Sequence, residues 1–72
     1  MAVPQHRQIL GETIRACRKQ NRLSQEQLAE KADLNPKYLG EVEGGHVNIS
    51  VDALARVAKA LRVRVRDLTC KF

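Results

Sequence analysis

The stretch from Leu23 to Gly45, with the sequence LSQEQLAEKADLNPKYLGEVEGG, constrains the fold of this chain more than any other part of it. Ser24 is followed three residues later by Gln27, and this pattern is a capping box that predicts the start of a helix. A second start signal comes soon afterwards. Asn35 is a favoured N-cap residue, and Pro36 suits the first helical position because its missing N–H would have no partner there.

The second of these helices also has a clear end signal. Gly44-Gly45 is a strong C-terminal signal, which predicts that the second helix runs from Pro36 to Glu43. Only Asp33 and Leu34 separate the preceding helix from the N-cap of this one, Asn35. Two short helices joined by so tight a turn form a helix-turn-helix, here predicted over residues 24–43.

Helical patterns also flank this unit. Leu10, Ile14 and Cys17 follow one another at steps of four and three, which predicts a helix over about Arg7–Gln20. Residues 1–6 are expected to form a flexible leader. Ser50 is an N-cap for a fourth helix, in which four apolar residues share one face. They are Leu54, Val57, Ala58 and Leu61.

A short fifth helix is expected near Val65–Thr69. No segment shows the alternation of apolar and polar residues that is typical of strands. The sequence therefore predicts an all-α fold of five helices, with the helix-turn-helix formed by the second and third. Its 72 residues make one domain, residues 1–72, in which residues 51–72 hold the last two helices.

Charge favours a nucleic-acid partner. Lys and Arg number 13 against 8 Asp and Glu, so the formal net charge is +5 and the sequence pI is about 9.8. A pI above about 9 is typical of nucleic-acid-binding domains. No apolar run approaches the ~18 residues that span a bilayer, and no signal peptide is visible. We therefore expect a cytoplasmic protein with no membrane partner.

Metal and cofactor sites are not indicated. Cys17 and Cys70 belong to no ligand-spacing motif, and His46 has no second ligand nearby, so neither a metal nor another cofactor is expected. No nucleophile–base pair, paired carboxylates or phosphate-binding loop is apparent, so we expect no enzymatic activity and see no small-molecule ligand. A domain this small usually needs a metal, a disulfide or a partner subunit, which leaves oligomerisation as its support.

Three segments together resemble the phage-repressor-like regulators called the Xre or Cro/repressor type. They are IRACRKQNRLSQEQLAEKADL, YLGEVEGG and NISVDALARVAKALRV, which cover about Ile14 to Leu68. The segment YLGEVEGG, with NIS two residues later, is similar to the controller proteins of restriction–modification systems. The resemblance implies a repressor-like domain that binds double-stranded DNA and regulates transcription.

The resemblance also implies which residues contact DNA. Gln25, at the start of the second helix, matches a glutamine that touches phosphate and neighbouring base edges. The loop after the third helix matches a phosphate-contacting stretch, with His46, Asn48 and Ser50 as donors. The matched recognition positions in the third helix are Asn35, Pro36, Lys37, Tyr38 and Glu41.

Several of these positions have two interpretations. Lys37 can read guanine or hold a phosphate, and Glu41 can accept from cytosine or restrain Lys37 four residues earlier. Asn35 can act only as a cap. Tyr38 can pack on the core, contact DNA, or do both. Gly40 is unfavourable inside a helix, and a close approach of the helix backbone to DNA would explain it.

Two matched positions are expected to be structural. Arg18 and Glu43 correspond to a buried ion pair that ties the first helix to the end of the third. Asp33 stands where the family usually has glycine in the turn, at a position that needs positive φ. Asp is among the few other residues that adopt this conformation, so the departure predicts some strain and the same fold.

The C-terminal part matches the family's two-fold interface. Val63, Val65, Leu68 and Phe72 leave more apolar surface than a small domain needs, so they are the expected dimer contacts. A homodimer would place two recognition helices about 34–36 Å apart and read a near-palindromic operator. The alternative is an antitoxin-like module that neutralises a partner protein, although no neutralising extension is visible.

Overall fold

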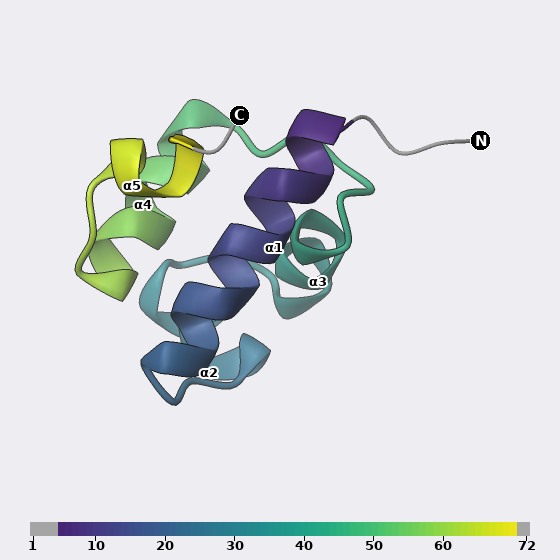
Figure 1. Cartoon of the computed structure of the whole chain (residues 1–72). Helices are drawn as coiled ribbons and strands as arrows, with labels where there is room; N and C mark the ends of the chain where they lie inside the picture. The colour runs from purple at the N-terminus through teal and green to yellow at the C-terminus, as the bar shows by residue number, and fades with distance from the viewer. Residues whose placement is uncertain (1–4, 71–72) are drawn as a thin grey trace.

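The computed structural model describes residues 5–70, and these form five helices without a strand, as the sequence predicted. The helices are α1 (Gln5–Gln20), α2 (Gln25–Lys31), α3 (Pro36–Glu43), α4 (Val51–Leu61) and α5 (Val65–Thr69). α1 crosses the middle of the domain, with α3 on one side and α4 and α5 on the other (Figure 1).

The first helix begins earlier than predicted. α1 starts at Gln5 and not at Arg7, so Gln5 and His6 are helical and do not belong to a leader. The apolar stripe that predicted this helix begins only at Leu10, which is why sequence periodicity placed the start too late. The rest of the predicted leader, residues 1–4, lies outside the described residues.

Side-chain caps start the next helices where the sequence placed them. Ser24 Oγ accepts from the N–H of Gln27 at 3.0 Å, and Gln27 Oε1 accepts from the N–H of Ser24 at 2.8 Å. Asn35 Oδ1 accepts from the N–H of Lys37 at 2.8 Å. These bonds satisfy backbone donors that have no partner within the helix, so they define where α2 and α3 begin.

The turn between α2 and α3 has the left-handed conformation that its position requires. Asp33 has φ 55°, and the N–H of Leu34 then donates to the carbonyl of Ala29 at 2.7 Å. This bond reverses the chain within two residues. It brings α3 against α2 and fixes the orientation of α3.

The core lies where α1 and α2 pack against α3, α2 packs against α4, and α5 packs against α1 and α4. Gly11 allows α1 to pass very close to the end of α3, because a Cβ at this position would lie 2.5 Å from the carbonyl oxygens of Val42 and Glu43. The fully buried large side chains are Ile14, Leu28, Leu39, Val57, Leu61 and Leu68.

Candidate nucleic-acid interface

The recognition helix has one buried and one exposed face. Leu39 and Val42 are buried against the core, whereas Pro36, Lys37 and Glu41 are exposed. α3 therefore presents a short polar ridge, with its capped N-terminus open to solvent. A helix of this shape can enter the major groove of DNA.

A buried network holds the C-terminal end of α3 in place. Arg18 on α1 donates from Nε to Glu43 Oε2 at 2.8 Å and from Nη2 to Glu43 Oε1 at 3.1 Å. The Arg18 Nη1 group donates to the carbonyl of Leu23 at 2.8 Å, just before the cap of α2. The guanidinium thus joins α1, the start of α2 and the end of α3. This is the ion pair that the resemblance implies.

Gln25 takes part in the same network. Its Nε2 group donates to Glu43 Oε1 at 3.1 Å, while the residue as a whole is exposed. The amide is therefore oriented by a carboxylate that is itself fixed by Arg18. An oriented donor at a helix N-terminus is suited to a phosphate oxygen, because the free backbone N–H groups there attract anions as well.

Tyr38 links the recognition helix to the loop that follows it. The ring is half-buried against the core, and the hydroxyl donates to the carbonyl of Asn48 and accepts from the N–H of Ser50, both at 3.4 Å. The side chain therefore positions the loop over residues 46–50 next to the N-terminal half of α3. It packs on the core and still presents its polar end at the surface.

Two side chains that were predicted to contact DNA already accept a hydrogen bond from the chain's own backbone. The Asn35 side-chain oxygen caps α3, and Ser50 Oγ accepts from the N–H of Ala53 at 3.1 Å to cap α4. The side-chain amide of Asn35 and the hydroxyl of Ser50 can each still donate a hydrogen bond. His46 and Asn48 are exposed in the loop between them. The structure thus brings the predicted residues of α2, α3 and the loop to one region of the surface.

The charged residues of α3 do not restrain each other. Among residues 5–70, the only ion pair is that of Arg18 with Glu43, so Lys37 and Glu41 are both unpaired. Gly40 is half-buried beside Gln25, whose side chain would lie 3.5 Å from an added Cβ. That is ordinary contact, so packing within the chain does not require a glycine at this position.

Most of the positive charge lies outside the recognition segment. Residues 35–50 contain one Lys and two Glu, which gives a formal charge of −1 against +5 for the whole chain. The cations concentrate instead on α1 and along α4 and α5, where Arg56, Lys59, Arg62, Arg64 and Arg66 are all exposed. The positive charge is therefore spread over the domain, while α3 and the loop after it carry mainly uncharged polar groups.

One predicted dimer contact is placed wrongly. Leu68 is completely buried in the chain's own core, because the turn of α5 directs it between α1 and α4. Val63 is half-buried and Val65 is exposed, while Phe72 lies outside the described residues. Sequence analysis also missed two residues. Val51 is 81% exposed at the start of α4. Gly11 allows the close approach of α1 to α3, and its place inside a helical pattern was the only sign of this in the sequence.

Comparison with known proteins agrees with this geometry. A family model described as helix-turn-helix matches residues 14–68, which includes α2, α3 and α4 entirely. The chain belongs to the Xre-type helix-turn-helix family. It is therefore a DNA-binding regulator of transcription, and its relatives are regulators and not enzymes.

Relatives of this helix-turn-helix regulator include controllers and a repressor. It is 44% identical to the control protein C.SmaI of Serratia marcescens over 62 residues, covering 86% of this chain and 74% of that protein. It is 45% identical to the immunity repressor of Bacillus phage phi105 over 56 residues, or 78% of this chain but only 39% of the repressor. The restriction-modification controller C.AhdI from Aeromonas hydrophila superposes with a TM-score of 0.85 at 35% identity, covering 86% of this chain and 94% of that one.

No helix within residues 5–70 is long and apolar enough to span a bilayer.

Proposed function

We propose that this protein is a homodimer in the cytoplasm that binds a near-palindromic operator in double-stranded DNA through α3. The observation that carries the proposal is the exposed ridge of Pro36, Lys37 and Glu41, held by the buried Arg18–Glu43 pair. In this arrangement Lys37 faces the bases or their flanking phosphates. Gln25 and the loop over residues 46–50 position the domain on the backbone.

Exposed apolar groups on the C-terminal half support the homodimer. Val65 is 39% exposed, and Val63 beside it is half-buried. A single 72-residue chain buries a small core, so a partner subunit that covers these valines would add stability. Two-fold symmetry would then present two α3 helices to adjacent major grooves about 34–36 Å apart.

Selection from random duplexes at near-physiological salt, followed by sequencing, tests the operator. We expect enrichment of a near-palindrome with half-sites about one helical turn apart. Salt-sensitive binding without an enriched sequence would contradict sequence-specific recognition. Sedimentation at micromolar protein concentration tests the homodimer, which is refuted by a monomer that persists even with operator bound.

A pair of substitutions tests the role of Lys37. Lys37→Gln is compared with Lys59→Gln, which makes the same change of charge at an exposed position on α4. If Lys37 reads a base, its loss relaxes the selected sequence at one position per half-site and costs about 1–3 kcal/mol. If it holds a phosphate, binding weakens uniformly and the salt dependence falls by about one ion. Equal effects of the two substitutions would refute a role for Lys37 in the interface.

A further inference from the structure

A groove of about 420 Å³ lies between the C-terminal ends of α2 and α4. No residue of α3 or of the loop over residues 46–50 lines it, so the groove is separate from the proposed DNA contacts. The last residue of α2 and the turn after it form one wall, and the C-terminal half of α4 forms the other. The charged residues that line it are Lys31, Asp33, Arg56, Lys59 and Arg62.

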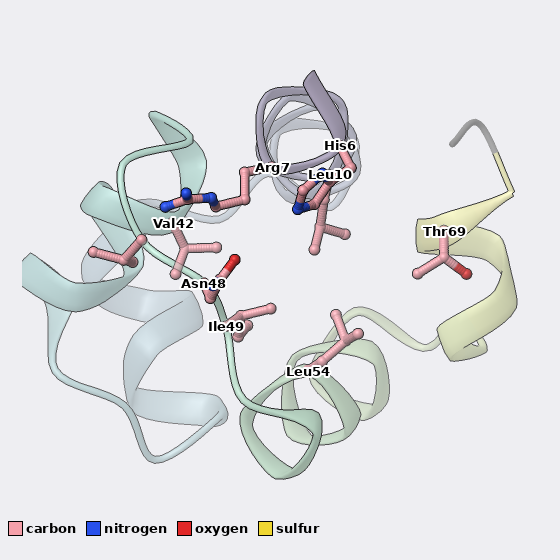
Figure 2. A pocket seen from close by; sticks show the side chains of 9 residues that line it. His6, Arg7, Leu10, Val42, Asn48, Ile49, Leu54 and Thr69 are labelled. Carbon is pink, nitrogen blue, oxygen red and sulfur yellow. The ribbon is translucent and has the colours of Figure 1, made fainter. Parts of the chain in front are cut away.

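The groove differs in character from a smaller cavity of about 190 Å³ between α1, α4, α5 and the loop that follows α3. Figure 2 shows Leu10, Ile49 and Leu54 directed into that cavity, whose wall is largely apolar. The groove instead has charged side chains on both walls. Its two uncharged lining residues are Ala32, which is buried, and Ala60, which is half-buried. The groove therefore combines exposed charges with a small apolar base.

The charge of the groove favours an anionic occupant. Four of its lining residues are cations against the single carboxylate of Asp33, and all five are exposed. None of them forms an ion pair within residues 5–70. Some positive charge is expected here, because the C-termini of α2 and α4 each carry a partial charge of roughly −0.5. The cations exceed that need, and about two positive charges are left without a partner in the chain.

Arg62 occupies this groove in a backbone conformation that favours glycine. It is the C-cap of α4 and has φ 60°, in the left-handed region. Glycine is the usual residue at such a helix end, because it has no Cβ to clash. An arginine is unfavourable for the backbone there, so its side chain has a role outside the chain's own folding. A guanidinium can bind a carboxylate through two N–H groups.

We propose that this groove docks an acidic peptide segment of a partner protein. Carboxylates of the segment pair with the cations on both walls, and one small apolar side chain rests against Ala32 and Ala60. Asp33 favours a peptide over a nucleic-acid backbone, because it repels evenly spaced phosphates whereas a peptide can place an uncharged residue beside it. A sugar–phosphate backbone also offers no small apolar side chain to the two alanines.

Amide NMR on the full chain without operator tests the docking. The probe is a short peptide of glutamates around one central valine, and the neutral control peptide has Gln in place of every Glu. At near-physiological salt we expect the acidic peptide to give saturable shifts around the groove, with a Kd on the order of 0.1 mM. The neutral peptide should bind at least about tenfold more weakly, because several charge pairs are lost together.

Arg62→Gly is the informative variant, and Arg22→Gly is its matched control. Both arginines are exposed and left-handed, with φ 60° and 57°, but Arg22 follows α1 and does not line the groove. Each change removes one positive charge and relieves the backbone, so both variants should fold and melt no lower than the wild type. Arg62→Gly should weaken binding of the acidic peptide by about threefold, whereas Arg22→Gly should leave it nearly unchanged.

The docking site is overturned if the acidic peptide gives no saturable shifts at the groove, or if the two variants bind it equally. Tighter binding of single-stranded oligothymidylate than of the peptide at this groove would assign it to nucleic acid instead. Groove shifts that grow with protein concentration alone would assign it to a second copy of the chain. Failure of operator selection would bear only on the proposed function, because no operator is present in this test.

Discussion

Replacing Arg18 with alanine should destabilise the domain more than any other single change at a charged residue. The substitution removes two hydrogen bonds to Glu43 and one to the carbonyl of Leu23. The Glu43 side chain is only 3% exposed, and its remaining hydrogen-bond partner within residues 5–70 is the amide of Gln25. The variant would therefore hold a buried carboxylate without a counter-charge at the junction of α1, α2 and α3.

The expected loss is a large share of the total stability. Removing one partner of a buried ion pair typically costs about 3–5 kcal/mol. A chain of this length has a free energy of unfolding of about 4–11 kcal/mol at the usual ~0.05–0.15 kcal/mol per residue. We therefore expect the melting temperature to fall by more than about 10 °C, since each 1 kcal/mol shifts it by roughly 4–8 °C in a domain of this size.

Thermal melts followed by circular dichroism measure this loss. All variants are compared at one protein concentration, because dimerisation would make the midpoint depend on it. Arg15→Ala is the control on the exposed face of α1, and it should change stability by less than about 0.5 kcal/mol. The double variant Arg18→Met/Glu43→Leu should melt above Arg18→Ala, because no buried charge is left unpaired.

Two results would refute this reasoning. A loss for Arg18→Ala of less than about 1 kcal/mol would mean that the pair behaves like an exposed surface ion pair. A double variant no more stable than Arg18→Ala would mean that the uncompensated carboxylate of Glu43 is not the main cause of the loss.

Three other substitutions separate stability from DNA binding. Gly11→Ala should lower the free energy of unfolding in chemical denaturation by about 1–3 kcal/mol, because its Cβ would meet two carbonyl oxygens of α3 at 2.5 Å. An unchanged free energy of unfolding would contradict that close approach. Gly40→Ala should instead raise stability by about 0.5–1 kcal/mol, because its Cβ meets only Gln25 at 3.5 Å, yet it should weaken operator binding in a fluorescence titration. Tyr38→Phe should cost less than about 1 kcal/mol of stability, because the two bonds lost are long, while operator binding weakens as the loop loses its anchor. Unchanged operator affinity in either of the last two variants would argue against its proposed place in the interface.

The sequence by itself determined where most helices begin and end. Ser24, Asn35 and Ser50 each cap a helix with their own side chains, and the predicted range Pro36–Glu43 is the range observed for α3. Such signals act over three or four residues, so they are legible without any tertiary contact. The start of α1 has no comparable signal, and its prediction was two residues late.

Only the tertiary structure decided which faces are buried and which are free. Leu68 and Val65 look alike in the sequence, but packing of α5 buries the first in the core and leaves the second exposed. The same holds for the two mid-helix glycines, since Gly11 lies against backbone of α3 whereas Gly40 has room for a side chain. The groove between the C-terminal ends of α2 and α4 was likewise invisible to sequence analysis. Burial, close approach and empty space depend on how distant segments pack, and local sequence patterns carry no information about that.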